Sequence, residues 1–463
     1  MPLVILGVLL ALACVVAIRD WRRGWMLIPV FAVLQDPVRK LTPGTPVAIS
    51  FSIMAIYAAV LFAARRELLA HLRELGRRFP AIYSAAVVVA VTVLIAAVNG
   101  LLTFGVKAWQ VPVLSLALYL APLPAVILGY AFLQREEVLY RFFRVYAAVT
   151  SVALVGTLLE YWRVKARVLG IVAMPFDYIR HLPGIQIRML SGFYRAPDIM
   201  SWHAAMLTSI GLVMAMRPGS RRPIWIGVAG WGFLSCILSG RRKSIYFVIA
   251  FAGAVLWRYF QRLNARQLLA LFAAALMIGL VVMRLESGES TNVYTRGATA
   301  SNAEIVKRLE GGVRETFRQF GYMGAGLGAA TQGTRHLPGQ TRSLGWQEGG
   351  LGKLAVELGL AGLLAVAVFV MLLFRMLLRL TAIGDVPGSS QFLRVALFGF
   401  FTANVMGFTA SAQAYTDGVL ALMTAFLAGC LLATAALDER VAAANEAPAT
   451  PGYAAARQPA ATT

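Results

Sequence analysis

Charged residues are scarce in this sequence, and their scarcity excludes an ordinary soluble protein. Only 14% of the 463 residues are Asp, Glu, Lys or Arg, whereas 59% are hydrophobic. Soluble globular domains contain about 25% charged residues. The long apolar runs also lack the alternation of polar and apolar residues that a transmembrane barrel requires. The composition therefore predicts a helical protein embedded in a membrane.

Cysteine and histidine are also scarce, which excludes the common metal and disulfide frameworks. The three cysteines lie inside apolar runs and form no CxxC pair, so they predict neither a disulfide framework nor a metal site. The four histidines show neither HxxxH nor HExxH spacing, the spacing that metal-binding helices use. We therefore expect no catalytic metal and no other cofactor.

Long apolar segments are what the sequence has in abundance. A helix of about 20 apolar residues crosses the roughly 30 Å hydrocarbon core of a bilayer. About thirteen such segments lie near residues 2–18, 24–35, 46–64, 81–103, 109–133, 142–161, 197–216, 223–239, 244–258, 267–283, 350–374, 392–411 and 415–436. They predict an all-α integral membrane protein with about 12–13 transmembrane helices. The second segment is short and contains Pro29, which suggests a broken or re-entrant element.

The polar remainder of the chain defines two further regions. Residues 284–348 form one large loop between two late helices, inside a membrane domain that we place at residues 1–436. Loops of this length are usually functional or disordered, and this one contains aromatic residues and glycine turns, so we predict that it covers an active site. Residues 437–463 are rich in Ala, Pro and Thr, and we expect a disordered cytoplasmic tail there.

The distribution of basic residues predicts the orientation of the chain. The basic connection at 64–80 is cytoplasmic by the positive-inside rule, and alternation then places residues 163–197, 239–244 and 284–347 outside. The short outer turn SGRRKS (239–244) nevertheless holds three adjacent cations. A bound anion explains them, with Arg241 and Arg242 as a clamp for a phosphate or diphosphate. The alternative is a membrane anchor whose charged groups reach the lipid phosphates.

A second basic stretch, RMLSGFYRAPDIMSWH (188–203), leads into an apolar segment. Arg188 and Arg195 are candidate ligands for the same anion. Arg195 lies just before a helix that begins with proline, and helix N-termini favour anions. His203 falls inside the helix, where we expect a hydrogen-bonded core histidine rather than a catalytic one.

The large outer loop supplies three further candidate anion ligands. Arg296 follows a tyrosine and a threonine near the beginning of the loop, and Arg314 and Arg318 share one face of a helix because they are four residues apart. The alternative for these two arginines is the solvated face of an amphipathic helix. Nucleic acid is not an expected ligand despite the net charge of +22, because there is no basic soluble domain to hold it.

The end of the large loop carries a glycine-rich turn and a candidate general base. The turn GYMGAGLG (321–328) follows no strand, so it is not a dinucleotide fingerprint; its glycines permit a tight turn packed on the membrane domain. Glu348 precedes the segment that begins near Gly350 and can accept a proton from a hydroxyl nucleophile. The alternative is a carboxylate that stabilises a helix N-terminus. Glu357, deeper in the segment, is a candidate structural partner for an arginine.

Five short motifs follow one another over residues 180–365. They are RMLSGFYRAPD, SGRRKS, Thr295-Arg296, GAGLG and EGGLGKLAVELGLAGLL. In these motifs the chain resembles the bacterial superfamily of O-antigen ligases and O-antigen polymerases. The resemblance implies metal-independent transfer of glycan from an undecaprenyl-diphosphate donor to an acceptor hydroxyl, with outer-loop arginines bound to the diphosphate.

The resemblance also assigns roles to individual positions. Arg241 or Arg242 matches the Ser-Arg position at the top of a span, and Arg296 matches the arginine that opens the large loop. Ligase members place a histidine before the ELGxxG-like segment, where this sequence has Glu348. His336 lies twelve residues earlier. This departure favours the polymerase branch or an exopolysaccharide relative over a lipopolysaccharide ligase.

With this resemblance, the sequence leads to the hypothesis of a glycan polymerase in the bacterial inner membrane with its active site on the periplasmic side. Glu348, Arg241 and Arg296 are the predicted catalytic residues, and the expected partners are the lipid-linked donor, a glycan or lipid acceptor and membrane lipid. One alternative is an O-antigen ligase that transfers glycan to a lipid or protein. Another is a transporter or flippase of a lipid-linked anionic glycan, and a third is a non-catalytic assembly subunit. A transporter should place ionisable residues near the bilayer midplane, and the predicted spans contain few.

Overall fold

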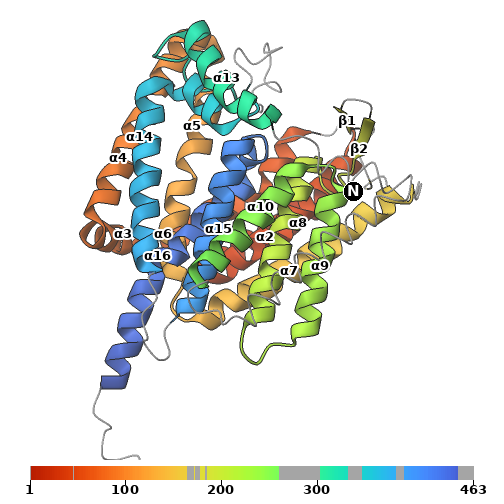
Figure 1. Ribbon diagram of the computed structural model, residues 1–463, viewed down its shortest axis with the longest axis vertical. Coiled ribbons are helices and arrows are strands. Elements are labelled where there is room, and N and C mark those ends of the chain that lie inside the picture. The colour runs from red at the N-terminus through yellow and green to blue at the C-terminus, as the bar shows by residue number, and fades with distance from the viewer. Residues whose placement is uncertain are drawn as a thin grey trace, which may run out of the picture.

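The computed structural model describes residues 2–44, 46–163, 172, 178–182, 185–259, 303–331, 347–381 and 390–446, and these residues are almost entirely helical (Figure 1). The α-helices are α1 (Pro2–Arg19), α2 (Trp21–Leu41), α3 (Ser52–Arg78), α4 (Pro80–Phe104), α5 (Gln110–Leu120), α6 (Pro122–Phe132), α7 (Glu136–Tyr161), α8 (Pro197–Met216), α9 (Arg222–Leu238), α10 (Arg242–Tyr259), α13 (Ala303–Phe320), α14 (Gly350–Leu380), α15 (Gln391–Ala410) and α16 (Gly418–Glu446). Short 3-10 helices are η1 (Val47–Phe51), η2 (Val106–Ala108) and η6 (Ala414–Thr416), and the strands are β1 (Tyr178–Leu182) and β2 (Ile185–Met189).

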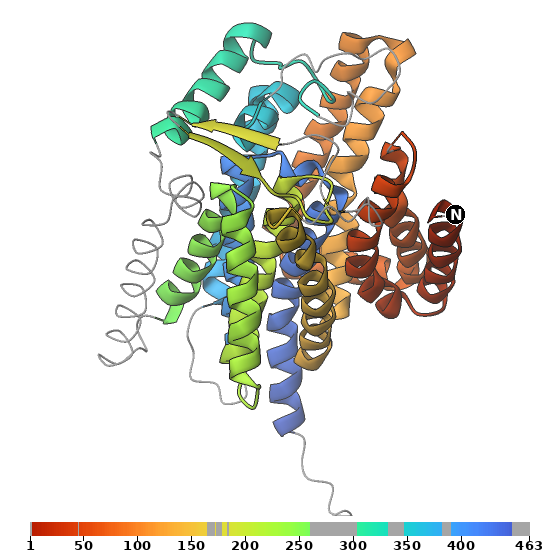
Figure 2. The same cartoon turned by 90° about the vertical axis from the view of Figure 1, so that its right-hand side faces the viewer.

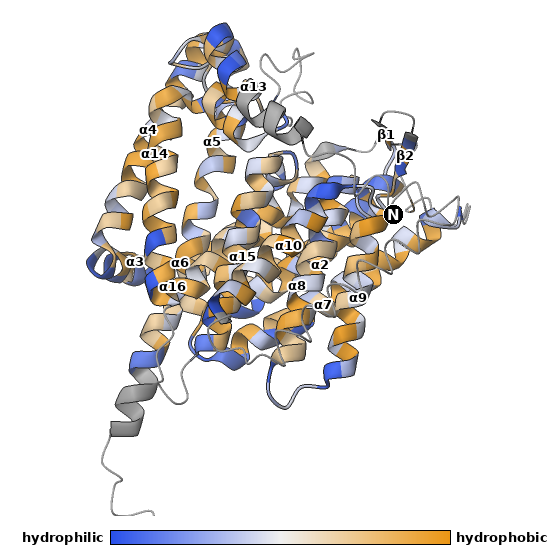
Figure 3. Cartoon of the chain, viewed as in Figure 1, coloured by the Kyte–Doolittle hydropathy of each residue, from blue (hydrophilic) through white to orange (hydrophobic). Residues whose placement is uncertain are grey.

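The length and composition of these helices confirm a helical membrane protein. Within the described residues, nine helical stretches are long and apolar enough to cross a bilayer: Pro2–Arg19, Ala48–Arg78, Pro80–Phe104, Gln110–Phe132, Glu136–Tyr161, Pro197–Met216, Gly350–Leu380, Gln391–Ala410 and Gly418–Glu439. Most of their residues are hydrophobic (Figure 3). The predicted segments at 24–35, 223–239 and 244–258 are also helical, as α2, α9 and α10. The predicted segment at 267–283 lies outside the described residues.

Local sequence explains where several of these helices begin. Proline occupies the first turn of α4, α6 and α8, where its missing N–H leaves no helical hydrogen bond unmade. At α2 the carboxylate of Asp20 accepts hydrogen bonds from the backbone N–H groups of Arg22 and Arg23, which satisfies two donors that the helix cannot pair internally.

Helix α2 is unbroken, so the break that the sequence suggested in this segment does not occur. It runs from Trp21 to Leu41 with both Pro29 and Pro37 inside it. A proline removes one helical hydrogen bond, but the helices of a membrane protein tolerate this loss where neighbouring helices surround them. Pro29 is buried, and Trp25 one turn earlier stacks on Phe426 of α16 at a ring-centroid distance of 4.4 Å.

The glycine-rich turn docks into a break in α14, in agreement with the prediction that it packs on the membrane domain. Gly359 has φ 68° and ψ −168°, which interrupts the helix after Leu358. The turn fills the break: the backbone N–H of Ala325 donates to Val356 O at 2.7 Å, and that of Leu360 donates to Tyr322 O at 2.8 Å. A Cβ atom on Gly359 would lie 2.6 Å from the carbonyl oxygens of Tyr322 and Met323, so only glycine fits.

Two further features differ from the expectations. The antiparallel pair β1 and β2 forms a small hairpin (Figure 2) in a region where no strand was expected. α16 continues to Glu446, past residue 436, where we expected a disordered tail to begin. Helix α13 lies at the beginning of α14 (Figure 1), and its exposed arginines, Arg314 and Arg318, lie on one face as predicted.

Candidate functional site

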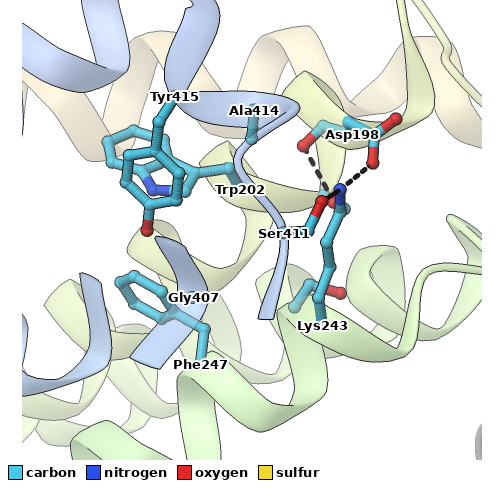
Figure 4. Close-up of a pocket in the computed structure, with 10 residues that line it drawn as sticks. Asp198, Trp202, Lys243, Phe247, Gly407, Ser411, Ala414 and Tyr415 are labelled. Atoms are coloured by element: carbon cyan, nitrogen blue, oxygen red, sulfur yellow. Dashed lines mark hydrogen bonds and ion pairs between the residues drawn. The ribbon is translucent and has the colours of Figure 1, made fainter. Parts of the chain in front are cut away.

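One carboxylate, that of Asp198, organises the basic residues at the beginning of α10. Asp198 lies in the first turn of α8, and its side chain is only 12% exposed. Arg241 donates from Nη2 to Asp198 Oδ2 at 2.7 Å. Lys243 forms an ion pair with Oδ1 of the same carboxylate and donates to Ser411 Oγ at 2.9 Å (Figure 4). Two cations therefore share a single carboxylate.

The SGRRKS turn holds these two cations in place. Gly240 has a positive φ of 67°, and a Cβ there would lie 3.1 Å from side-chain carbons of Ile187 and Met189 on β2. Ser239 Oγ accepts a hydrogen bond from the backbone N–H of Arg241 at 3.1 Å, and Ser244 Oγ donates to Arg241 O at 2.7 Å. The turn thus packs closely against β2, and the two serine hydroxyls that flank it bind the backbone of Arg241.

A small pocket adjoins Lys243, between α8, α10, α15 and η6. It encloses about 280 Å³, including open space at its mouth, and is lined by Asp198, Ser201, Trp202, Lys243, Ser244, Phe247, Gly407, Ser411, Ala414 and Tyr415. The polar groups of Asp198, Lys243 and Ser411 gather on one side, and the rings of Trp202, Phe247 and Tyr415 on the other (Figure 4).

Glu348 lies beside this group of charges. Its carbonyl oxygen accepts a hydrogen bond of 2.9 Å from the backbone N–H of Ala412, the residue after the Ser411 that binds Lys243. Its carboxylate also interacts favourably with the charge of Lys243. The structure therefore brings two of the three predicted catalytic residues, Arg241 and Glu348, to the same place, with Lys243 as their common neighbour.

The hairpin covers the site. Arg180 on β1 donates to Gly240 O at 3.3 Å, and the hydroxyl of Tyr178 donates to Arg195 O at 3.2 Å. Burial raises the pKa of Tyr178 above its ordinary value; the charge of Asp198 adds to the shift, and nearby arginines, including Arg241, oppose it. Tyr178 is therefore a neutral hydrogen-bond donor at physiological pH.

The predicted diphosphate ligands fall into three groups. Arg242 is buried at the beginning of α10, next to Arg241, and Arg188 lies on β2 close enough to Glu160 to interact with its charge. Arg314 and Arg318 are exposed on α13, which reaches the beginning of α14 through a 3.5 Å hydrogen bond from Gln347 Nε2 to Thr316 Oγ1. Arg296, the third predicted catalytic residue, and His336 both lie outside the described residues.

Arg195 forms a different cluster, in which both ends of its guanidinium group pair with carboxylates. Its Nη1 donates to Asp36 Oδ1 at 3.0 Å, its backbone N–H donates to Asp36 Oδ2 at 3.0 Å, and its Nη2 pairs with Asp417. Because both guanidinium ends have carboxylate partners, we assign Arg195 to holding α2, the beginning of α8 and the η6–α16 junction together.

Sequence reasoning missed Asp198, Lys243 and Ser411 as site residues. Asp198 and Lys243 lie in the two basic motifs that the sequence singled out, so opposite charge was a usable signal, but Ser411 carries none. The expectation for His203 is confirmed: the residue is buried, its Nδ1 lies 2.7 Å from the hydroxyl of Tyr146, and its ring stacks on Tyr194.

Glu357 is fully buried in a separate network, and its partner is a lysine rather than an arginine. Lys353 Nζ lies 3.1 Å from Glu357 Oε2, which also accepts from the hydroxyl of Tyr119 at 2.7 Å. Oε1 accepts from the hydroxyl of Thr331 at 2.7 Å and from the backbone N–H of Ala330 at 3.2 Å. These contacts fix the end of the glycine-rich turn to α14.

Comparison with known proteins adds no assignment. No protein-family model matches the chain, and a search of curated proteins finds no match to its sequence. Among the described residues, no three His, Cys, Asp or Glu side chains are grouped so that they could hold a metal ion. The chain is a helical membrane protein whose described part gathers arginine, lysine and carboxylate side chains at one end of the helices.

Proposed function

We propose that this protein transfers glycan from a polyprenyl-diphosphate donor to a sugar hydroxyl, as a polymerase of the bacterial inner membrane with its site on the periplasmic side. The observation that carries the proposal is the group of cations around Asp198, next to Glu348. The resemblance of the motifs to the O-antigen ligase and polymerase superfamily supports it, and 12–13 spans with the large loop outside belong to the same proposal.

The charge balance of the site suits a doubly charged phosphate ligand. Among the described residues, two cations, Arg241 and Lys243, meet at the single carboxylate of Asp198, and Arg180 contacts the same turn from β1. Arginine binds phosphate oxygens with two parallel N–H groups, and lysine adds a compact charge. In the proposed complex Arg241 and Lys243 turn from Asp198 towards the diphosphate.

The other predicted arginines differ in how they contribute to the proposed binding of the diphosphate. Arg188 and Arg242 support the diphosphate from β2 and from the same turn. Arg296, Arg314 and Arg318 contribute from the large loop. Arg195 is left out, because Asp36 and Asp417 already occupy its guanidinium.

The proposed reaction is a displacement at the anomeric carbon of the donor sugar. The acceptor hydroxyl oxygen forms a bond to that carbon, the bond from the carbon to the diphosphate oxygen breaks, and the electron pair stays on the diphosphate. Glu348 takes the proton of the attacking hydroxyl. Arg241 and Lys243 stabilise the charge that develops on the leaving group, and such electrostatic stabilisation often accounts for most of the rate enhancement of an enzyme.

Two other functions compete with polymerase activity. A ligase would use the same donor site with a lipid or protein acceptor, and Glu348 in place of the ligase histidine argues for the polymerase. A transporter needs ionisable groups along a path through the membrane. The buried pair of Lys353 and Glu357 is instead saturated by partners close to the beginning of α14, which favours chemistry at the membrane edge.

The deciding experiment uses the purified protein with an undecaprenyl-diphosphate-linked repeat unit and no other acceptor. A ladder of lipid-linked products, seen by gel or by mass, establishes a polymerase. Product that forms only after a lipid or protein acceptor is added establishes a ligase. Absence of product in both conditions, with donor moved across proteoliposomes instead, would overturn the enzymatic proposal in favour of transport.

Glu348→Gln tests the proposed base. The substitution keeps the shape of the side chain but removes its ability to take a proton, so we expect turnover to fall by about 10²- to 10⁴-fold while donor affinity changes little. The matched control is Glu315→Gln, at an exposed position on α13. Turnover of Glu348→Gln equal to that of the control would make Glu348 a helix-terminal carboxylate instead.

A further inference from the structure

A second basic region lies at the other end of the helices. α16 connects the two ends: Asp417, just before it, pairs with Arg195 beside the candidate site, and Glu439, close to its far end, pairs with Arg78 at the end of α3. α3 has 27 residues and is therefore about 40 Å long. Since the hydrocarbon core is roughly 30 Å thick, its last turns reach the polar edge of the membrane.

An open hollow marks this end of α3. It is lined by Ala70, Arg73, Glu74, Arg77 and Arg78. Arg73 and Arg77 are exposed and one helical turn apart. Within the described part of the chain neither forms an ion pair or a side-chain hydrogen bond. The N–H groups of these two guanidinium groups can therefore donate hydrogen bonds to a ligand.

The other charges of the hollow already have partners. Arg78 pairs with Glu439. Glu74 accepts a hydrogen bond from the hydroxyl of Tyr130 at 2.7 Å, and His71 Nδ1 lies 3.0 Å from its second oxygen. The helix face thus presents two neighbouring arginines, and the small side chain of Ala70 leaves space beside them. This geometry suits a phosphate group.

The residues that precede this pair along α3 indicate that the phosphate belongs to a lipid. Phe62 and Leu69 are each 60% exposed, and at 3.6 residues per turn they share a face with Arg73 and Arg77. Phe62 lies about 16 Å along the helix from Arg73. An acyl chain can therefore run along Phe62 and Leu69 while its headgroup reaches the arginines.

We propose that Arg73 and Arg77 of α3 bind the phosphate of an anionic phospholipid whose acyl chain lies against Leu69 and Phe62. A headgroup with net negative charge satisfies both guanidinium groups. A zwitterionic headgroup brings its own ammonium group, which repels the second arginine. The site is consequently selective for anionic lipid, and it is independent of the chemistry proposed for the other end of the molecule.

The test measures lipid binding to purified full-length protein by native mass spectrometry, with phosphatidylglycerol and phosphatidylcholine titrated separately. The variant is Arg73→Gln/Arg77→Gln. The matched control is Arg375→Gln/Arg379→Gln, which removes two exposed arginines at the same spacing near the end of α14. We expect the first variant to bind phosphatidylglycerol roughly 25-fold more weakly, because each of the two basic residues typically contributes about fivefold at a membrane surface. The control should bind like wild type, and phosphatidylcholine binding should change in neither.

Three results would overturn the proposal. Equal phosphatidylglycerol affinity in the variant and in wild type would show that the hollow binds no lipid. Equal losses in the variant and the control would show diffuse attraction rather than a site. Displacement of the lipid by millimolar inorganic pyrophosphate, with pyrophosphate binding to wild type in the absence of lipid, would assign the site to a soluble anion. If the double variant does not elute as a single folded species, Arg77→Gln alone carries the test, with an expected loss of about fivefold.

Discussion

Two charged regions of this molecule differ in the ratio of cations to carboxylates and in how deeply these groups are buried. In the Glu357 network one carboxylate and one lysine are balanced, Glu357 is fully buried, and both of its oxygens accept hydrogen bonds from Tyr119, Thr331 and Ala330. Around Asp198 two cations share one carboxylate, and the side chain of Arg241 remains 23% exposed.

The difference separates a structural role from a binding role. A buried ion pair with every lone pair satisfied holds its neighbours in one arrangement and has nothing left for a ligand. Partly exposed cations in excess of their carboxylates can exchange a protein partner for an anion. Substitutions in the first region should therefore act on stability, and those in the second on activity.

Glu357→Gln should have the largest effect on stability. It leaves Lys353 buried without its counter-charge, and breaking one partner of a buried pair costs about 3–5 kcal/mol. We expect the free energy of unfolding to fall accordingly, measured as a lowered Tm in detergent. Adding Lys353→Met should recover much of the loss, because the double variant buries no unpaired charge.

Glu348→Gln is the matched control from the other region, and its Tm should stay close to that of wild type. A Glu357→Gln protein as stable as this control would contradict the assignment of a structural network. A double variant less stable than Glu357→Gln alone would show that the packing of Lys353, rather than its charge, supports α14.

The helices of this fold could be predicted from the sequence, but the contacts that define both regions could not. Runs of apolar residues fix where a helix crosses a membrane, because every backbone group must be paired inside hydrocarbon. The break at Gly359 depends on carbonyl groups of Tyr322 and Met323, which are more than 30 residues away. Local patterns do not encode such a tertiary contact.

The candidate site could be predicted only in part, because its charges follow a local pattern whereas its contacts are tertiary. The positive-inside rule made the three cations of the SGRRKS turn an anomaly, because it predicts that this turn lies outside. In the structure two of them, Arg241 and Lys243, contact Asp198. The pairing of Asp198 with residues 43 and 45 positions later requires α8 and α10 to lie together. For Arg195 the sequence shows only basic neighbours, whereas the structure pairs it with Asp36 of α2 and with Asp417 just before α16.

Arg241→Ala should have a large effect on activity with little change in stability. If Arg241 stabilises the departing diphosphate, its loss should lower the rate of transfer by about 10²- to 10³-fold. The measurement is product formation from the lipid-linked donor at equal amounts of folded protein. The control is Arg222→Ala, an exposed arginine at the opposite end of α9, which should transfer glycan like wild type. A large fall in Tm without a specific loss of rate would place Arg241 with the structural residues.

Tyr119→Phe should produce the smallest effect and sharpens the comparison most. It removes one of the donors to Glu357 and leaves the ion pair with Lys353 in place, so we expect a loss of about 1.5 kcal/mol, the lower end for a hydrogen bond to a charged group. Because the network fixes the glycine-rich turn to α14, hydrogen exchange at the backbone amides of Ala325 and Leu327 should become faster. Tyr83→Phe, at an exposed position on α4, is the control and should change neither quantity. Unchanged exchange in Tyr119→Phe would mean that the backbone hydrogen bonds of the turn hold it without Glu357, and the carboxylate would then need another explanation than the docking of this turn.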